Sequence, residues 1–287
     1  MSTTPSPRSC LSVPGSSHRM IEKALASAAD EVVIDLEDAV AINAKAEARS
    51  ITTLALAQAP AGRRVAVRVN AVGTPWCHSD LIALGSSARA PDSIVIPKVD
   101  TVGDVAFAER LLTGVARATG NPAPGIQVLI ESASGLLEAP AIAKSSPHVE
   151  ALILGYADLS ADLGRKVAAA PWSVARERVV WAARAAGIRA VDGPYLDVAD
   201  DADFRSALAD AVATGFDAKW VIHPQQIDAV NAALTPTREE LDWAREVLDA
   251  LEAGRASGVG SVALNGAMLD EAVAVAARRT LAKGGVR

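Results

Sequence analysis

Two carboxylates of this sequence have positions that suit a metal site. Glu131 follows an apolar run at residues 126–130, and Asp158 comes shortly after another at residues 151–154. If these runs are neighbouring strands, two carboxylates from adjacent strand ends, completed by water and a bidentate substrate, form the partly open octahedral site that Mg²⁺ prefers. The alternative is that Glu131 and Asp158 pair with Arg68 and Lys98 and hold no metal.

Arg68 lies inside an earlier apolar run, at residues 65–69, where a valine stands on each side of it. A solvated surface arginine is not expected there, and a guanidinium in that position could hold a substrate carboxylate through two parallel hydrogen bonds. A structural ion pair with Glu37 or Asp38 is the alternative. Lys98, at the end of the next run, could in principle form a Schiff base, but the pattern favours a structural or phosphate-facing role.

Several other kinds of site lack support in the sequence. The four histidines show no H-E-x-x-H spacing, and no G-x-S-x-G nucleophile elbow occurs. No G-x-G-x-x-G follows the first strand, no P-loop is present, and the two cysteines have no metal-type spacing. These absences disfavour a histidine metal site, serine hydrolase chemistry, dinucleotide binding and a disulfide framework.

The composition disfavours further partners. The net charge is −6 and the isoelectric point is about 5.3, so no basic surface for nucleic acid or an anionic membrane is expected. No run approaches 18 apolar residues free of charge, and the polar, Pro-rich start lacks the apolar segment of a signal peptide. We therefore expect a cytoplasmic, unprocessed chain with small-molecule partners, no nucleic acid and no membrane.

The elements that must position these residues alternate along the chain. Short runs rich in β-branched residues predict strands at residues 11–13, 32–36, 65–69, 93–96, 126–130, 151–154, 188–191 and 220–222. Segments with helical periodicity lie between them, at residues 20–28, 44–57, 105–118, 173–186, 202–214 and 226–234. This alternation predicts an α/β fold, a closed (β/α)8 TIM barrel over residues 1–235, in preference to an open doubly wound sheet.

A C-terminal helical appendage is expected at residues 236–287. It would contain a charged helix near 238–252, a Gly- and Ser-rich connection at 253–260 and a second helix near 267–282. The glycines would let this segment swing, so a lid and an oligomerisation arm are both compatible with it. In a (β/α)8 barrel the chemistry lies at the carboxyl ends of the strands, and one site there accounts for the polar residues at the strand ends.

A series of motifs follows the order of the strands. It consists of Pro14, Gly15 and Ser16 with Arg19, VIDLEDAV at 33–40, Lys45 with Ala48 and Arg49, VRVN at 67–70, IPK at 96–98, IESA at 130–133, LGYADL at 154–159 and GFDAKWVIHPQQ at 215–226. In this order, over about residues 10–280, the motifs resemble those of citrate lyase beta-subunit-like proteins in the HpcH/HpaI aldolase superfamily.

This resemblance implies a carbon–carbon lyase that depends on Mg²⁺, with Mn²⁺ able to substitute. Glu131 and Asp158 would bind the metal. The substrate would be a CoA thioester, a 3-hydroxyacyl-CoA of the malyl-CoA or citramalyl-CoA type, cleaved to acetyl-CoA or another acyl-CoA plus a 2-oxo acid. Thioesterase or synthase activity could run in the same site.

The resemblance also implies roles for single residues. Arg68 would stabilise developing oxyanion charge and orient the 2-oxo acid, while Glu37 and Asp38 would hold metal-bound water or Arg68 in place. Asp270, in the sequence GAMLD at 266–270, would exchange a proton with the enolate carbon in a neighbouring subunit's site. Relatives often have a proline soon after this aspartate, where this chain has Glu and Ala, and a carboxylate at a helix N-terminus is the alternative for it. Substrate-binding roles fall to Arg68, Pro14 and Gly15 and, along the route of the CoA phosphates, to Arg19, Lys45 and Arg49.

Two further functions stay open from the sequence. One is an aldolase that acts on free 2-oxo acids, and the other is a non-catalytic CoA-binding subunit that has kept the barrel. The resemblance also implies a homo-oligomer, a trimer or hexamer, because a site completed by a neighbour's residue needs at least a dimer.

Overall fold

The computed structural model describes residues 6–167, 171–256, 262–264 and 266–285. The chain divides into two compact units, Pro7–Asn231 and a second that contains Ala232–Arg287. The first unit ends close to residue 235, where the sequence predicts the end of the barrel.

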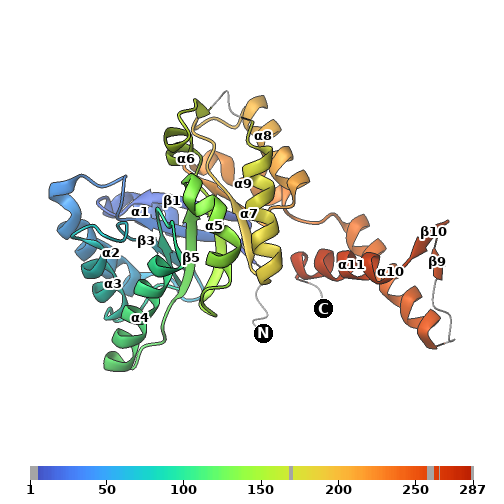
Figure 1. Cartoon of the computed structure of the whole chain (residues 1–287), viewed down its shortest axis with the longest axis horizontal. Helices are drawn as coiled ribbons and strands as arrows, with labels where there is room; N and C mark the ends of the chain where they lie inside the picture. The colour runs from blue at the N-terminus through green and yellow to red at the C-terminus, as the bar shows by residue number, and fades with distance from the viewer. Residues whose placement is uncertain (1–5, 168–170, 257–261, 265, 286–287) are drawn as a thin grey trace. The chain divides into compact units, whose positions relative to one another are not determined.

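The first unit is a closed barrel of parallel strands surrounded by helices (Figure 1). Each strand pairs with the next along the chain, and the last pairs with the first. This confirms the predicted (β/α)8 barrel. The strands are β1 Ser9–Pro14, β2 Glu31–Asp35, β3 Arg64–Arg68, β4 Ser93–Ile96, β5 Gly125–Ile130, β6 Val149–Leu154, β7 Arg189–Asp192 and β8 Ala218–Val221.

The helices of the barrel follow the strands in turn. They are α1 His18–Leu25, η1 Ile42–Ala44, α2 Lys45–Gln58, α3 Cys77–Gly85, α4 Val102–Thr119, α5 Ala133–Ala143, α6 Tyr156–Asp162, α7 Ser173–Ala186, α8 Ala202–Thr214, η3 Pro224–Gln226 and α9 Ile227–Ala233. Three of them, α3, α5 and α6, are not among the helices predicted from sequence. Helix α5 contains Pro140 and α6 is only seven residues long, so neither has a strong helical pattern of its own.

Side chains inside the barrel form three layers, because alternate residues of a strand face the same side. Along β2 the alternate residues are Glu31, Val33 and Asp35, and the parallel register places them beside Arg64, Ala66 and Arg68 of β3. The middle layer belongs to an apolar cluster at the centre of the barrel, made of Cys10, Val33, Ala66, Val95, Leu129, Ala151, Ile153, Val191, Ala218 and Trp220. Charged layers therefore lie at both ends of an apolar core.

The charged layer at the amino ends of the strands is internally paired. Arg64 donates to Glu31 at 2.6 Å and also pairs with Glu150, which Arg189 contacts at 3.1 Å. Burial would raise the pKa of Glu31, but the charges of Arg189 and Arg64 outweigh it and lower that pKa. This layer closes the amino end of the barrel. We call the other end, where the carboxyl ends of the strands lie, the barrel mouth.

The second unit contains two packed helices and a short hairpin. Helix α10, Arg238–Ala256, packs against α11, Glu271–Lys283, and β9, Val262–Leu264, pairs antiparallel with β10, Ala267–Leu269. The helix predicted to begin near residue 267 instead begins at Glu271, because residues 267–269 pair with β9. The predicted connection at 253–260 is helical as far as Ala256, and residues 257–260 of it lie outside the described residues.

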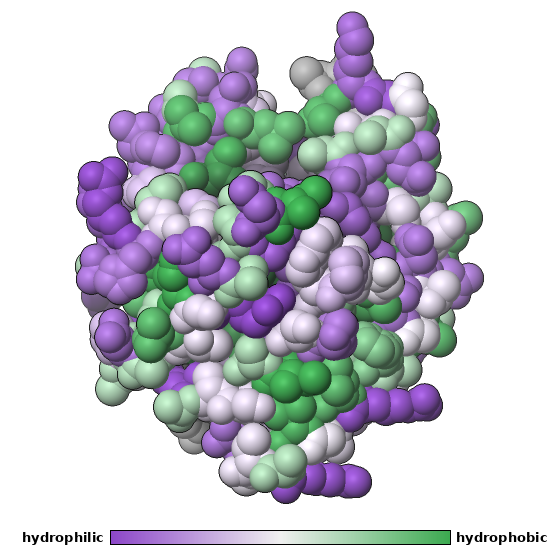
Figure 2. Space-filling model, turned by 90° about the vertical axis from the view of Figure 1, so that its left-hand side faces the viewer, coloured by the Kyte–Doolittle hydropathy of each residue, from purple (hydrophilic) through white to green (hydrophobic). Residues whose placement is uncertain are grey.

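Hydrophobic and hydrophilic side chains are mixed on one face of the first unit (Figure 2). Figure 2 shows hydrophobic side chains in several separate patches among hydrophilic ones on the face of the barrel that lies at the left in Figure 1. Within the residues described here, no helix is long and apolar enough to cross a membrane. The two cysteines, Cys10 and Cys77, are free and buried.

Candidate active site

The barrel mouth collects charged side chains from five neighbouring strand ends. Asp35 ends β2 and Glu37 and Asp38 follow it, Arg68 ends β3, Lys98 follows β4, Glu131 follows β5, and Asp158 lies in the first turn of α6 after β6. We call Asp35, Glu37, Asp38, Glu131 and Asp158 the carboxylate cluster. The structure thus brings together Arg68, Glu37, Asp38, Glu131 and Asp158, the residues that the sequence assigns to catalysis and to the metal within the barrel.

Arg68 is held by the strand beside it. Its Nε and Nη2 donate to the two carboxylate oxygens of Asp35 at 2.8 and 2.6 Å, and its Nη1 lies 3.0 Å from Glu37 Oε2. Burial alone would lower the pKa of Arg68, but these acidic partners raise it above its usual value. A guanidinium has five N–H groups, so this clamp fixes the direction of Arg68 and leaves donors for a substrate carboxylate or oxyanion.

Asp35 organises the segment that follows β2 as well as Arg68. Its Oδ1 accepts a hydrogen bond from the backbone N–H of Glu37 at 2.8 Å, and its Oδ2 accepts one from Ala39 at 3.1 Å. The ion pair of Arg68 with Glu37 that the sequence weighed is present, and Asp35 is a further partner that the sequence did not assign. Asp35 and Arg68 are direct neighbours in the β2–β3 register, and this pairing of strand ends is the signal that links the two residues.

Lys98 directs two of its groups into the carboxylate cluster. Its backbone N–H donates to Glu131 Oε1 at 2.7 Å, and its Nζ donates to Glu37 Oε1 at 2.7 Å and lies 3.8 Å from Asp158 Oδ1. With a φ of 52°, it is the one non-glycine among the described residues in the left-handed region, a strained conformation that turns both groups inward. Although burial opposes it, the hydrogen bond and charge of Glu37 raise the pKa of Lys98. Lys98 stays protonated, which argues against a Schiff base.

Glu131 is a buried carboxylate beside other negative charges. It is 4% exposed. Burial first, and then the charges of Asp158 and Glu37, raise the pKa of Glu131 to about 8. Without a bound cation, Glu131 therefore carries a proton through the neutral range.

The donors at the barrel mouth fit a hard divalent cation. The five groups of the carboxylate cluster outnumber the cationic side chains near them, Arg68, Lys98 and Lys45, so negative charge is in excess there. Among the described residues no group of three or more His, Cys, Asp or Glu is arranged around one metal position. Mg²⁺ commonly takes only one or two protein carboxylates and keeps water in its other positions. Glu131 and Asp158 are suited to be those two.

Gly155 makes room for Glu131, a role that is not among those predicted from the sequence. A Cβ on Gly155 would lie 2.7 Å from both Cβ and Oε2 of Glu131, closer than such atoms approach. The position of Gly155 directly after β6 is the signal in the sequence that could have indicated a close approach of the backbone.

The end of β1 is also close-packed at the barrel mouth. Pro14 lies beside Asp35 in the β1–β2 register, and Gly15 N–H donates to the carbonyl of Asp35 at 2.8 Å. A Cβ on Gly15 would lie 2.8 Å from Leu36 and 2.9 Å from that carbonyl oxygen. Gly15 therefore has a role in packing. A contact with substrate would be an additional role.

The ammonium group of Lys45 is buried, whereas a contact with a CoA phosphate requires an exposed one. Lys45 is 6% exposed, and its Nζ donates to the backbone carbonyls of Leu36 and Glu37 at 2.9 and 2.7 Å. Burial lowers the pKa of Lys45, although the acidic side chains around it oppose that shift. Its ammonium thus fixes the backbone that carries Glu37, and it is not directed at solvent.

Arg49 is also engaged within the barrel, whereas Arg19 is exposed on α1. Arg49 Nε donates to Asp80 at 2.7 Å, and the fully buried Asp80 accepts hydrogen bonds from both the backbone and the side chain of Asn70. Of the three cations that the sequence places on the route of the CoA phosphates, Arg19 has the exposure that such a contact needs.

Asp270 lies in the second unit, where it caps a helix. Its Oδ1 accepts a hydrogen bond from the backbone N–H of Val273 at 3.1 Å at the start of α11, and the residue is exposed. This is the helix-end position that the sequence weighed as the alternative. Capping occupies one carboxylate oxygen and leaves the other accessible.

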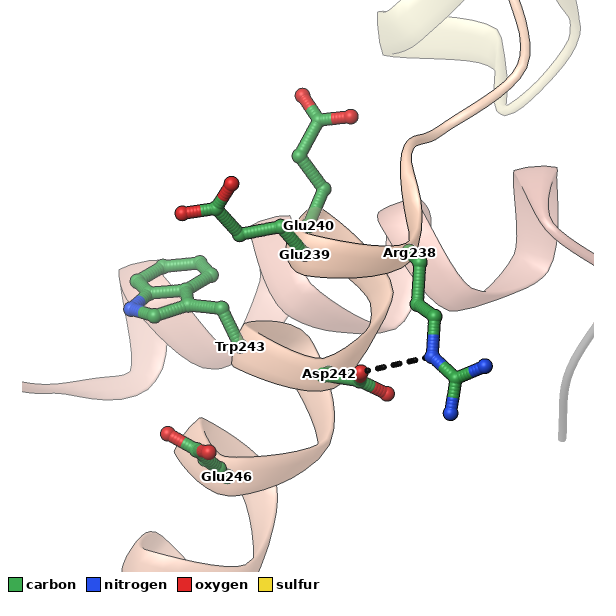
Figure 3. A pocket seen from close by; sticks show the side chains of 6 residues that line it. All are labelled: Arg238, Glu239, Glu240, Asp242, Trp243 and Glu246. Carbon is green, nitrogen blue, oxygen red and sulfur yellow. Dashed lines mark ion pairs between the residues drawn. The ribbon is translucent and has the colours of Figure 1, made fainter.

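The first turns of α10 line a separate concave surface, formed by Arg238, Glu239, Glu240, Asp242, Trp243 and Glu246 (Figure 3). Arg238 lies 3.5 Å from Asp242, and Figure 3 shows Trp243 between Glu239 and Glu246 on the other side of the helix. None of the residues that the sequence assigns to chemistry lines this surface, so we do not consider it a candidate active site.

A closed parallel barrel with a clamped arginine and a carboxylate cluster at its mouth defines the class, a TIM-barrel protein with a site at the carboxyl ends of its strands. The chain belongs to the HpcH/HpaI aldolase/citrate lyase family, whose sequence profile matches residues 8–224. This confirms the family resemblance found in the motifs.

The relatives of this chain include proteins with two different names. The chain is 36% identical to L-malyl-CoA/beta-methylmalyl-CoA lyase of Cereibacter sphaeroides, over 90% of this chain and 88% of that protein. It is also 36% identical to citrate lyase subunit beta of Escherichia coli, over 96% and 92%. A solved structure of CitE from Mycobacterium tuberculosis in complex with magnesium, acetoacetate and coenzyme A is 34% identical, covers 99% of this chain and 100% of that one, and superposes with a TM-score of 0.76.

Gly155→Ala should disturb the carboxylate of Glu131. Because the new Cβ would collide with that side chain, we expect Mg²⁺ affinity to fall roughly tenfold or more, as for other changes in the support of metal ligands. Isothermal titration calorimetry with MgCl₂ measures this. Gly114→Ala is the control, because a Cβ there meets nothing within 4 Å and alanine suits its helix. Unchanged Mg²⁺ affinity in Gly155→Ala would contradict the assignment.

Glu131→Gln should change how stability depends on pH in the metal-free protein. Folding raises the pKa of Glu131 from 4.5 to about 8. Between these pH values the carboxyl group is ionised only in the unfolded protein, so the free energy of unfolding decreases as pH rises through that range. Glutamine does not titrate. In EDTA, the Tm of the variant minus that of the parent should therefore increase from pH 6 to pH 9 by about 3 °C or more.

Thermal unfolding at several pH values measures this difference. Glu177→Gln is the control, since it makes the same change at an exposed position of α7. A difference for Glu131→Gln that does not vary with pH would contradict the raised pKa.

Proposed function

We propose that this protein is a Mg²⁺-dependent carbon–carbon lyase. It cleaves a 3-hydroxyacyl-CoA thioester of the malyl-CoA or citramalyl-CoA type to acetyl-CoA or another acyl-CoA plus a 2-oxo acid. The observation that carries the proposal is the pair Glu131 and Asp158 in an excess of negative charge beside the clamped Arg68. The named relatives, a malyl-CoA lyase and a citrate lyase subunit, support this reaction class.

Glu131 and Asp158 would hold the metal, for which Mn²⁺ can substitute. When bound, Mg²⁺ supplies Lewis-acid polarisation of substrate oxygen atoms and neutralises part of the carboxylate charge. The CitE structure with magnesium and coenzyme A supports both ligands. Lys98 holds Glu131 through its backbone N–H, which leaves Oε2 of that carboxylate for the metal.

Arg68 would orient the carboxylate of the 2-oxo acid portion and stabilise the negative charge that develops on oxygen as the carbon–carbon bond breaks. The clamp with Asp35 keeps the guanidinium in place before substrate arrives, so little reorganisation is needed during the reaction. Glu37 and Asp38 would steady Arg68, Lys98 and water molecules around the metal. Their ion pairs with Lys98, and that of Glu37 with Arg68, support this role.

CoA would enter along the first strand end. Arg19 is exposed and can offer a charge-assisted contact to a phosphate, and Pro14 and Gly15 border the mouth beside it. Lys45 and Arg49 would act indirectly, because their hydrogen bonds go to Leu36, Glu37 and Asp80.

Asp270 is our candidate for the acid/base that exchanges a proton with the enolate carbon. This assignment rests on the GAMLD motif at 266–270. With Asp270 acting in a neighbouring subunit's site, the protein would be a homo-oligomer, a trimer or a hexamer.

Two other functions would use the same barrel. An aldolase of free 2-oxo acids would need no CoA, and a non-catalytic CoA-binding subunit would turn nothing over. The excess charge around Glu131 favours a metal site over a purely structural one, and the CoA-dependent relatives favour the thioester over the free acid. Thioesterase or synthase activity could run in the same site.

The test is a panel of malyl-CoA, citramalyl-CoA, 3-methylmalyl-CoA and citryl-CoA, each with MgCl₂ or with EDTA. We expect a 2-oxo acid to form without free thiol in MgCl₂ and no reaction in EDTA. Glu131→Gln and Asp158→Asn should be inactive. Free thiol would indicate thioester hydrolysis. The corresponding free hydroxy acids, tested beside the panel, should not react, and their cleavage at rates equal to those of the thioesters would favour the aldolase. Inactivity on all four substrates would sink the lyase assignment.

Asp270→Asn separates the catalytic from the helix-capping role of this residue. Asparagine caps helices as well as aspartate does, so we expect unchanged Tm and substrate binding, with kcat lower by about 10²- to 10⁴-fold. Normal turnover in this variant would remove Asp270 from the mechanism.

Mixing two inactive variants tests the source of Asp270. Subunits of Asp270→Asn keep an intact barrel, and subunits of Glu131→Gln keep Asp270. If Asp270 completes a neighbour's site, co-refolded mixtures should regain part of the activity. Mixtures as inactive as either variant alone would mean that Asp270 serves its own barrel or none.

A further inference from the structure

A network of polar side chains, three buried and one partly buried, lies outside the barrel wall, and the proposed chemistry does not use it. Arg176 Nε donates to Tyr156 Oη at 2.7 Å, and Tyr156 Oη in turn donates to Asp192. Lys219 Nζ donates to the other oxygen of Asp192 and, at 2.9 Å, to the carbonyl of Gly193. We call Arg176, Tyr156, Asp192 and Lys219 the Tyr156 network.

Burying the charged groups of the Tyr156 network gives the fold little net stability, which suggests that their positions serve another purpose. Asp192 is 0%, Lys219 2% and Tyr156 5% exposed, and a buried ion pair of this kind is often no more stabilising than an apolar contact of similar size. The hydroxyl of Tyr156 accepts from Arg176 and donates to Asp192, so it is held from two sides. The hydrogen bonds therefore fix direction more than they add stability.

The ring of Tyr156 is fixed as tightly as its hydroxyl. The ring of Trp172 meets it edge-on, with centroids 5.0 Å apart, and the Arg176 guanidinium lies 5.5 Å from its centroid. A Cβ on Gly193 would lie 2.9 Å from the ring and 2.1 Å from the carbonyl oxygen of Leu154. The end of β7 is thus packed directly against the start of α6.

Tyr156 is the first residue of α6, the helix whose first turn carries Asp158. Gly155, which packs against Glu131, comes immediately before it. Helix α6 has only seven residues and no side-chain hydrogen bond at its N-cap, so its own structure holds its first turn weakly. Tyr156, two residues before Asp158 and next to Gly155, is anchored by hydrogen bonds to residues outside the carboxylate cluster.

We propose that the Tyr156 network positions the first turn of α6, and with it Asp158 and the backbone against which Glu131 packs, for binding of a divalent cation. The inference rests on the proposed function, because it concerns the same metal site. Tyr156 contacts neither carboxylate of the metal pair in the proposal, so it is a positioning residue. Its hydroxyl should affect how tightly the cation is held more than how fast the loaded site turns over.

Tyr156→Phe is the main variant. It removes the hydroxyl and keeps the ring, its contact with Trp172 and the pairing of Asp192 with Lys219. We expect the Mg²⁺ dissociation constant, measured by isothermal titration calorimetry, to rise about tenfold, while kcat at saturating Mg²⁺ changes less than about twofold. Thermal unfolding in EDTA should show that the variant is folded.

The control is Tyr195→Phe, the same change at the second tyrosine of the chain. Tyr195 packs against Phe204, with ring centroids 5.8 Å apart, and belongs to neither the network nor the carboxylate cluster. Its Mg²⁺ affinity should equal that of the parent. Arg176→Gln provides a second test that leaves Asp192 and Lys219 paired, and it should weaken Mg²⁺ binding in the same direction but less.

The outcomes separate this inference from the proposed function. If the parent protein does not bind Mg²⁺, the proposed function fails. If the parent binds Mg²⁺ and both Tyr156→Phe and Arg176→Gln bind it equally well, the positioning role is overturned. Equal weakening in Tyr195→Phe, or a loss of kcat at saturating Mg²⁺ with unchanged affinity, would overturn it as well.

Discussion

The burial of Glu131 among other carboxylates is the constraint on which the rest of the barrel mouth depends. A carboxyl group that is 4% exposed beside Asp158 and Glu37 has its pKa raised to about 8, so it is ionised in the neutral range only with a compensating positive charge. The protein supplies some of that charge through Arg68 and Lys98, and both of these are themselves held by carboxylates. The balance that remains is negative, and a divalent cation is the simplest group that completes it.

Strand geometry explains why this charge collects at one end of the barrel. Alternate residues of β2 and β3 face inward, and the parallel register sets Asp35 beside Arg68 at the mouth and Glu31 beside Arg64 at the other end. Apolar residues such as Val33 and Ala66 separate the two layers. At the closed end the acids and bases pair with one another, which makes that layer structural. At the mouth the acids outnumber the bases, which makes it suited to bind something further.

Part of this arrangement could be predicted from the sequence, because the side chains at strand ends follow directly from the alternation of strands and helices. Glu131 and Arg68 belong to this part. Lys45 does not, since its acceptors are backbone carbonyls, which leave no mark in a sequence and which only the folded segment after β2 brings to its ammonium. Arg49 is similar, because its partner Asp80 is 31 residues away and lies on a helix, α3, that the sequence did not predict.

The two carboxylates proposed to hold the metal differ in how the fold fixes them. Glu131 follows β5 directly, so the hydrogen bonds of the sheet and the N–H of Lys98 determine its position. Asp158 lies on a helix too short to be rigid alone, so its position must come from contacts outside that helix. The Tyr156 network offers such contacts from α7, β7 and β8. The polar residues of these elements lie 20 to 63 positions after Tyr156 in the chain. In the positioning role that we propose, the buried polar groups behind this short helix hold its carboxylate in place although they take no part in the chemistry.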